Sequence, residues 1–395
     1  MIEKLISLFL GILAGLITGI LPSLHVNLAT LISIELFQDI TSIDLFIYII
    51  ALSVSSAFFN TIPLTFFSIP DSPETLISFN PLIKFFSKGK SYEAFLLTII
   101  GSLSSTLLLI LVSPLLILIY PIIFKFIKPS TSLLLIGISI FMIKKENNSK
   151  LWAIITFLLS GILGILTLTN QNLKEPLLPL LSGLFAIPSI LINMKNKTNK
   201  VNQQITQPNI TKFNILKTVP LSLLISFFST FLPAIGPSQS AVLISAITKF
   251  SPQESLILTG SLTTFNMLLS IISLYSIHKA RNGSIESLNK ISDKFTFENL
   301  ITALIVTLIV SSITTLIAIL LAKKFIKYSD KIKIEKLNIF FLIFTFLLIF
   351  IFSNFSGLLI SIIATSIGFI PILKGINRNH LMACIILPVI FYTLN

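Results

Sequence analysis

Apolar segments close to the thickness of a bilayer recur along the whole chain, and they decide its fold class. A transmembrane helix needs about 20 predominantly apolar residues. Only 11% of the residues are charged, whereas a soluble protein carries about a quarter. The sequence therefore predicts an all-α polytopic protein of the cell membrane. The segments lie at 5–21, 23–37, 45–69, 94–117, 118–143, 151–169, 177–193, 215–232, 237–249, 256–277, 298–322, 337–352, 357–373 and 380–394.

A polar stretch at 194–214 divides the chain into two halves with seven apolar segments each. This stretch is rich in lysine and contains no acidic residue. Placing it in the cytoplasm also puts most of the other lysines and arginines on the inner side, as the positive-inside rule requires. We therefore expect a first repeat at 1–193, a basic cytoplasmic linker at 194–214 and a second repeat at 215–395.

Each half opens with two short apolar segments that meet at a break containing proline. The first break is LPSLHVN at 21–27, and the second break is LPAIGPS at 232–238. We interpret each pair of segments as a re-entrant helical hairpin, at 5–37 and at 215–249, followed by five full crossings. Because five is odd, the two repeats have inverted topology, with about ten transmembrane helices in all. Two full spans in place of each hairpin would give the same loop orientation, so the depth of the hairpins stays open.

The two breaks could form a binding site. Proline removes a backbone donor, so a helix that reaches Pro22 or Pro233 must stop or kink. Helices that begin after the breaks would direct free amides and positive dipole ends at a common centre, which suits an anion. The alternative is that the breaks only kink helices and that polar side chains hold them together. Duplicated halves with discontinuous helices are typical of secondary transporters with a site near the midplane, and this favours the site.

Several polar residues could serve either the site or the structure. His25 could donate to an anion, change its protonation state or hydrogen-bond a carbonyl group. Asp71 is either a helix cap near the membrane surface or an acid of the site. Asn60 and Asn266 lie inside apolar spans and are either interhelical contacts or ligands. The end of a span is followed by His278, Lys279 and Arg281, which we expect to snorkel to the interface; the alternative is a role in gating or in attracting the substrate.

The sequence lacks the signatures of other functional classes. It has no HExxH, GxSxG or P-loop motif and no paired acidic cluster, so we predict no enzymatic activity and no cofactor. The net charge of +13 comes from scattered lysines without interleaved aromatic residues, so we predict no nucleic-acid partner. The single cysteine excludes a disulfide within the chain.

Five short stretches also occur together, in this order, in a known family. Together they resemble the large multi-span subunit of tripartite tricarboxylate transporters, and more closely its archaeal branch. The resemblance implies a permease whose two Pro-Gly loops line a carboxylate site. The family glycine that follows each proline is replaced here, by Ser23 and by Ala234. The stretches are GLITGILPSLHVN at 15–27, IPDSP at 69–73, KGKSYEA at 88–94, LPAIGPS at 232–238 and LYSIHKARNG at 274–283.

We predict a secondary-active permease for an organic anion, specifically a carboxylate, driven by a proton or sodium gradient. The alternative is a translocase for a phosphorylated polyprenyl lipid carrier. A third class, a membrane scaffold without transport, would keep the two breaks apart and fill them with apolar side chains. The expected partners are membrane lipid and a small anionic substrate, while homo-oligomers and accessory transporter subunits stay open. The candidate substrate-binding residues are Pro22, Ser23, His25, Asn27, Asn60, Asp71, Pro233, Gly236, Ser238, Gln239 and Asn266.

Overall fold

The structure is a computed structural model in which every regular element of the described residues is a helix. Nine helical stretches of this described part are long and apolar enough to cross a membrane. The predicted all-α polytopic membrane class is therefore confirmed. The described residues are 2–37, 41–67, 79–171, 173–195, 201–233, 235–291, 295–328 and 333–394.

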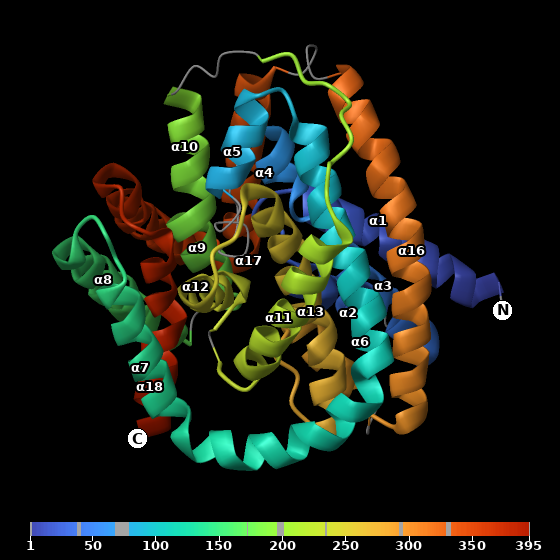
Figure 1. Cartoon of the computed structure of the whole chain (residues 1–395). Coiled ribbons are helices and arrows are strands. Elements are labelled where there is room, and N and C mark those ends of the chain that lie inside the picture. The colour runs from blue at the N-terminus through green and yellow to red at the C-terminus, as the bar shows by residue number, and fades with distance from the viewer. Residues whose placement is uncertain are drawn as a thin grey trace.

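The first half of the chain contains the helices up to Lys195 (Figure 1). The 19-residue α1 and the 11-residue α2 flank the first break. A long helix, α3, follows and continues after a turn into α4. The bounds are α1 Ile2–Ile20, α2 Val26–Leu36, α3 Ser42–Phe59, α4 Ile62–Phe67, α5 Phe79–Ser87, α6 Ser91–Ile127, the 3₁₀ turn η2 Lys128–Ser130, α7 Thr131–Lys144, α8 Lys150–Leu168, α9 Leu177–Leu181, the π-helical turn η3 Ser182–Ala186 and α10 Ile187–Lys195.

The second half opens with the same pattern. The 19-residue α11 and the 11-residue α12 flank the second break, and the long helix α13 follows. Figure 1 shows the chain ending at the lower left, beside α7. The bounds are α11 Lys212–Thr230, α12 Pro237–Ile247, α13 Pro252–Ile277, α14 Gly283–Glu286, α15 Leu288–Ile291, α16 Phe297–Tyr328, α17 Ile334–Lys374, the 3₁₀ turn η5 Arg378–Met382 and α18 Ala383–Leu394.

The α11–α12 pair returns to the side on which it starts. The Nζ atom of Lys217, near the start of α11, donates to the carbonyl oxygen of Lys249, just after α12, over 3.3 Å. The same Nζ atom pairs with Glu254 in the first turn of α13 at 3.1 Å. Both ends of this helical pair therefore lie together, and the second break lies at its far end. The geometry is that of a hairpin, whose depth in the bilayer stays a prediction.

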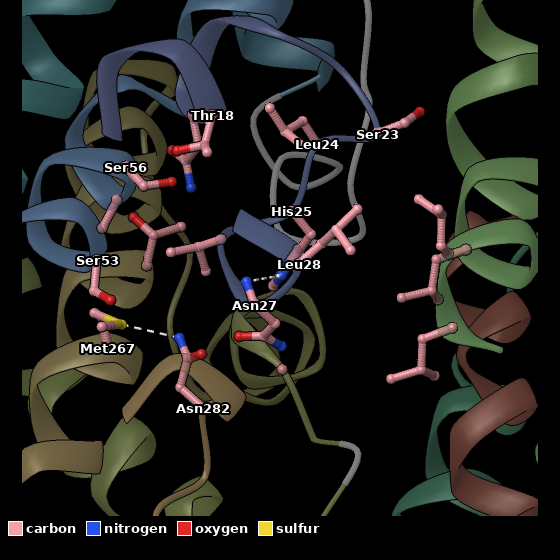
Figure 2. A pocket seen from close by; sticks show the side chains of 18 of the residues that line it. Thr18, Ser23, Leu24, His25, Asn27, Leu28, Ser53, Ser56, Met267 and Asn282 are labelled. Carbon is pink, nitrogen blue, oxygen red and sulfur yellow. Dashed lines mark hydrogen bonds between the residues drawn. The ribbon is translucent and has the colours of Figure 1, made fainter. Parts of the chain in front are cut away.

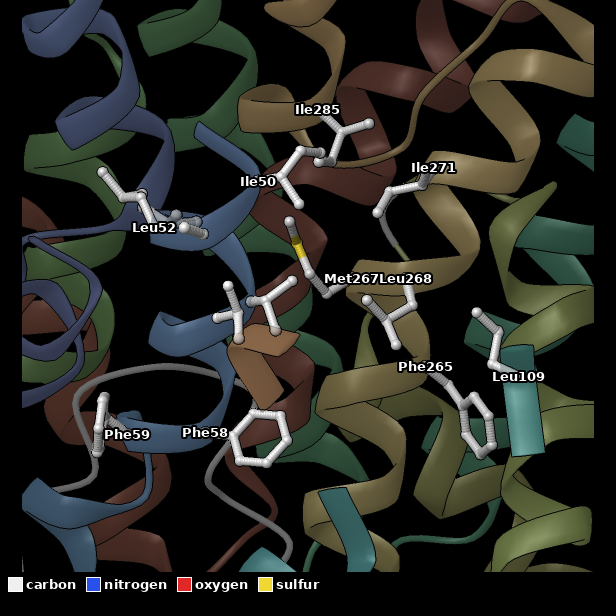
Figure 3. Close-up of a cluster of buried hydrophobic side chains, with 14 of the residues drawn as sticks. Ile50, Leu52, Phe58, Phe59, Leu109, Phe265, Met267, Leu268, Ile271 and Ile285 are labelled. Carbon is white, nitrogen blue, oxygen red and sulfur yellow. The ribbon is translucent and has the colours of Figure 1, made fainter. Parts of the chain in front are cut away.

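The core joins the two halves through α3 and α13. Figure 3 shows Ile50 and Phe58 of α3 gathered with Met267 and Ile271 of α13, and all four side chains are buried. Apolar side chains from both halves therefore fill one continuous core, which fixes the two breaks relative to each other.

A close backbone contact between α6 and α13 reinforces this arrangement. A Cβ atom at Gly260 would lie 1.9 Å from the carbonyl oxygen of Thr98, so only glycine fits this position. Ser102 donates to the carbonyl oxygen of Gly260 over 3.2 Å, and Ser261 donates to that of Gly101 over 3.3 Å. Small residues at such crossings let membrane helices approach closely and hydrogen-bond through their side chains.

The structure decides one boundary that the sequence leaves open. Three prolines, Pro114, Pro121 and Pro129, each allow a division between 94 and 143; the segments 94–117 and 118–143 place it near 117, but α6 continues through Pro114 and Pro121 to Ile127. A proline inside a helix removes one hydrogen bond and bends the helix, and neighbouring helices in a membrane protein tolerate this. The chain turns instead at η2. The division predicted between 352 and 357 lies at Asn354, whose φ of 55° interrupts α17.

The described part of the predicted linker, from residue 201 onward, packs against the start of α6. The side-chain oxygen of Gln203 accepts the N–H of Ser91 over 3.1 Å. The N–H of residue Gln204 donates to the carbonyl oxygen of Gly89 over 2.8 Å. These contacts hold an extended segment that connects the two halves (Figure 1).

Glu146 joins the turn after α7 to the turn before η5. Its carboxylate accepts the N–H of Asn377 over 2.9 Å and lies 3.1 Å from Nε2 of His380. Burial acts to raise the pKa of Glu146. The hydrogen bonds from Asn377, His380 and Asn148 outweigh burial and hold that pKa below its usual value. A lowered pKa means that this carboxylate stabilises the folded protein in its ionised form.

We expect Glu146→Gln to lower the melting temperature of the detergent-solubilised protein at neutral pH. The ionised carboxylate contributes its full stabilisation above the ordinary pKa of 4.5. That contribution is lost as the pH falls through the lower pKa of the folded state. The difference in melting temperature between wild type and variant should therefore be largest at neutral pH and shrink at acid pH, below 4.5. An equal difference at both pH values would contradict this role.

Candidate functional site

A cavity of about 300 Å³ is lined by residues 23–27 of the first break and by Gly236 of the second (Figure 2). Its volume is at the lower end of the roughly 300–1,000 Å³ typical of small-molecule sites. The wall combines leucine and methionine side chains with many hydroxyl and amide groups. The polar lining residues are Thr18, Ser23, His25, Asn27, Ser53, Ser56, Asn60, Glu175, Ser182, Thr263, Asn266 and Asn282, together with Gly236.

The structure brings six of the predicted site residues to this cavity. Two other predicted residues do not line the cavity: Pro22 is buried and Pro233 is exposed. Gln239 is buried and supports the second break. Asp71 and the side chain of Ser238 lie outside the described residues. The six that line the cavity are Ser23, His25, Asn27, Asn60, Gly236 and Asn266.

Ser23 forms the turn of the first break in a left-handed conformation, with φ at 71°. This conformation costs most residues other than glycine about 1–2 kcal/mol. The Oγ atom of Ser23 accepts a hydrogen bond from Thr345 of α17 over 3.0 Å. Figure 2 shows the hydroxyl directed away from the centre of the cavity. Ser23 therefore forms the turn of the first break and links it to α17 through this hydrogen bond.

Two substitutions separate the strain at Ser23 from its hydrogen bond. Ser23→Ala and Ser23→Gly both lose the contact with Thr345, but only alanine keeps the strain of a positive φ. We expect the glycine variant to be more stable than the alanine variant by about 1 kcal/mol. Thermal unfolding in detergent would measure this as a higher melting temperature. Equal melting temperatures would show that the turn imposes no strain.

The first turn of α2 presents donors to the cavity. Nδ1 of His25 accepts the backbone N–H of Asn27 over 3.3 Å, so a neutral imidazole carries its proton on Nε2. Oδ1 of Asn27 accepts the N–H of Ser284 over 3.0 Å. No described residue accepts a hydrogen bond from Nδ2 of Asn27. Both side chains are accessible at the cavity, His25 more so than Asn27.

The first turn of α12 reaches the same cavity from the other half of the chain. Gly236 is the N-terminal cap of α12, and its N–H donates to Oε1 of Gln239 over 2.8 Å. Pro237 occupies the first helical position, where its missing N–H costs nothing. Two helix N-termini therefore meet at one cavity, and each carries a partial positive charge. No lysine or arginine lines the cavity among the described residues.

Residues 278–286, which we call the tip-linking segment, connect the two breaks. Arg281 donates to the carbonyl oxygen and to Oγ of Ser229, at the end of α11, over 2.9 and 3.0 Å. Ser284 donates its N–H to Asn27 and also accepts a hydrogen bond from Ser53 over 2.9 Å. The position of Arg281 at the lipid interface stays a prediction. Within the protein, the carbonyl group and the hydroxyl of Ser229, at the C-terminal end of α11, accept hydrogen bonds from the guanidinium.

The sequence reasoning missed three kinds of lining residue. Ser53 and Ser56 of α3 lie close together on a buried helix, and hydroxyl groups spaced this way in an apolar run were the available signal. Glu175 follows a polar connection, and no motif marked it. Ser182 begins the π-helical turn η3, and such turns recur at functional sites. Sequence patterns do not reveal a π-helical turn in advance.

Comparison with known proteins assigns the chain to a family. The profile of the tripartite tricarboxylate transporter TctA family matches residues 5–383. The chain is also 29% identical over 402 aligned residues to an uncharacterized protein of Methanocaldococcus jannaschii, MJ1079, and the alignment covers 99% of each chain. No solved structure matches the chain.

Proposed function

Because the chain belongs to the tripartite tricarboxylate transporter TctA family, we propose that it is a secondary-active permease for an organic carboxylate. The family is a transporter family and not an enzyme family. The proposed substrate site is the cavity between the two breaks. The observation that carries this proposal is the meeting of two helix N-termini, at His25 and at Gly236, in one cavity.

The electrostatics of the cavity favour a delocalised anion. Helix N-termini bind carboxylate and phosphate groups through free N–H groups and the positive end of the helix dipole. Nε2–H of His25 and Nδ2 of Asn27 add neutral donors. Glu175 also lines the cavity, and apart from it the polar lining groups are dipoles and neutral side chains. The two helix N-termini and these donors would hold an anion without a fixed cation that would retain it. Such moderate binding suits transport, in which the substrate must also leave.

The repeat supports alternating access. Helix pairs of 19 and 11 residues open both halves, and a long buried helix follows each pair. In transporters built from inverted repeats, one repeat moves against the other around a fixed central site. The cavity lies between α3 of one half and α13 of the other. The scaffold alternative required separate breaks filled by apolar side chains, and these polar lining residues argue against it.

The family also bears on partners. Tripartite transporters contain further subunits, so we propose that this permease works with accessory subunits that deliver the substrate. A proton or sodium gradient would drive uptake. We place the polar linker on the cytoplasmic side, since its lysines satisfy the positive-inside rule there.

Uptake into proteoliposomes tests the proposal. Purified protein would be reconstituted and supplied with radiolabelled citrate, malate and succinate, with and without proton and sodium gradients. We expect gradient-dependent accumulation of at least one of these carboxylates. Protein-free liposomes are the control for leakage. Absence of uptake for all three, together with movement of a polyprenyl phosphate between leaflets, would replace the proposal with the lipid translocase.

A further inference from the structure

Two buried amide oxygens at the cavity lack hydrogen-bond donors. Asn60 of the first half and Asn266 of the second both line the cavity. Oδ1 of each is inaccessible to water and accepts no hydrogen bond from any described residue. The two asparagines occupy matching places in the repeat, in SAFFN at 56–60 and LTTFN at 262–266. A buried acceptor without a partner is costly, so a hydrogen-bond donor or a cation is expected beside each oxygen.

The end of α3 adds a negative potential at the same wall. Asn60 is the C-terminal cap of α3, and its N–H donates to the carbonyl oxygen of Ser56 over 3.0 Å. The last carbonyl groups of a helix have no intrahelical donors and give this end a partial negative charge. The first turn of α2, with His25, has the opposite polarity. The cavity therefore has one pole for an anion and one pole for a cation.

The neighbouring hydroxyl groups face the cavity as acceptors. Thr18 uses its proton to bond the carbonyl oxygen of Gly15 over 3.0 Å. Thr263 uses its proton on the carbonyl oxygens of Thr259 and Gly260. Both hydroxyl groups have therefore used their proton, and toward a ligand they can only offer the remaining lone pairs of their oxygens. Figure 2 shows Thr18 next to Ser56, on the wall of the cavity that lies away from Asn282.

We propose that Asn60, Asn266, Thr18 and Thr263 bind a sodium ion at the end of α3, beside the carboxylate. Neutral oxygens are the ligands that hard cations prefer, and an all-neutral set suits a monovalent ion. The described residues contain no cluster of three acidic, histidine or cysteine side chains that could hold a divalent metal. In transporters with broken helices, helix C-terminal ends and carbonyl groups bind the coupled sodium ion.

The role of this ion as the coupling ion rests on the proposed function, but its binding does not. A sodium ion beside the carboxylate would offset part of the negative charge of the substrate. Sodium would then raise the affinity for the carboxylate, and the carboxylate would raise the affinity for sodium by the same factor. This reciprocity gives the permease a means to couple uptake to the sodium gradient.

Binding of radioactive ²²Na⁺ to the detergent-solubilised protein tests the site without any carboxylate. We expect saturable binding that potassium does not displace, and a higher melting temperature in sodium chloride than in potassium chloride. Asn60→Leu and Asn266→Leu keep the side-chain volume but remove the oxygen, and each should weaken sodium binding about tenfold or more. The matched control is Asn338→Leu, because Asn338 is also buried and without partners but does not line the cavity.

Two results would overturn the sodium site. One is a wild-type protein that binds no ²²Na⁺. The other is unchanged sodium affinity in a folded Asn60→Leu or Asn266→Leu variant, with the fold judged by size-exclusion chromatography. Sodium binding without uptake of citrate, malate or succinate would instead overturn the proposed function and leave the site in place. Carboxylate uptake without sodium binding would support the proposed permease and overturn the sodium site.

Discussion

Asn27→Asp is expected to abolish carboxylate uptake while leaving the protein folded. Oδ1 of Asn27 accepts the N–H of Ser284 over 3.0 Å, and an aspartate oxygen can accept the same bond. The substitution replaces only the Nδ2 donor, and it puts a negative charge at the N-terminus of α2. Repulsion of a carboxylate at short distance in a partly buried site is worth several kcal/mol, so uptake should fall by about 100-fold or more.

The measurement is the initial rate of carboxylate uptake into proteoliposomes, with the amount of reconstituted protein held equal. Asn209→Asp is the matched control, because it adds the same charge at an exposed residue of the polar linker. Wild-type uptake in the Asn27→Asp variant would rule out the first turn of α2 as part of the anion site. A melting temperature close to that of wild type would show that the loss in the variant is functional.

Arg281→Gln is expected to reduce uptake by about 10- to 100-fold. The guanidinium donates two hydrogen bonds to Ser229, and hydrogen bonds to a charged group contribute roughly 1.5–3 kcal/mol. Without them, the tip-linking segment no longer fixes the end of α11 relative to Asn27 and α2. The protein should still insert and fold, because the core between α3 and α13 is unchanged.

The half-saturating concentration and the maximal rate of uptake show whether Arg281 positions the breaks or contacts the substrate. Arg281 does not line the cavity, so Arg281→Gln should lower the maximal rate more than it raises the half-saturating concentration. Arg281→Lys retains a cation that can reach one acceptor and should recover part of the rate. Lys279→Gln is the control, since this neighbouring side chain is exposed. An Arg281→Gln variant that keeps the full wild-type rate of uptake would show that the tip-linking segment does not couple the two breaks.

Much of the fold was predictable because hydrocarbon imposes simple rules. Spans must be long, apolar and helical, so the polytopic class follows from the sequence. The positions of the breaks follow from Pro22 and Pro233. The turn at η2, which contains Pro129, could not be chosen from sequence alone, because Pro114 and Pro121 carry the same local signal but lie inside α6. Tertiary contacts decide whether a proline ends a helix or only bends it.

Part of the candidate site was likewise predictable from the sequence, and part was not. Pro-containing breaks and matched asparagines identified residues from both halves, since a repeat doubles any local pattern. The contact of Arg281 with Ser229 was not predictable, because an arginine at the end of a span looks the same in sequence whether lipid headgroups or a protein carbonyl group bind it. At Ser23, which replaces the family glycine, the backbone has a φ of 71°, and this conformation was not predicted. Contacts between distant segments, such as Asn27 with Ser284, carry no local signal.

Protection of cysteines from a thiol reagent by substrate tests the central claim, that both breaks form one carboxylate site. Cys384 is the only cysteine of the chain and is buried, so Cys384→Ala provides a cysteine-free background. His25→Cys and Gly236→Cys would each be labelled with a maleimide in the presence of citrate, malate or succinate. We predict that the transported carboxylate slows labelling at both positions, with the same half-protecting concentration. Protection at only one position, or at neither, would contradict a shared site.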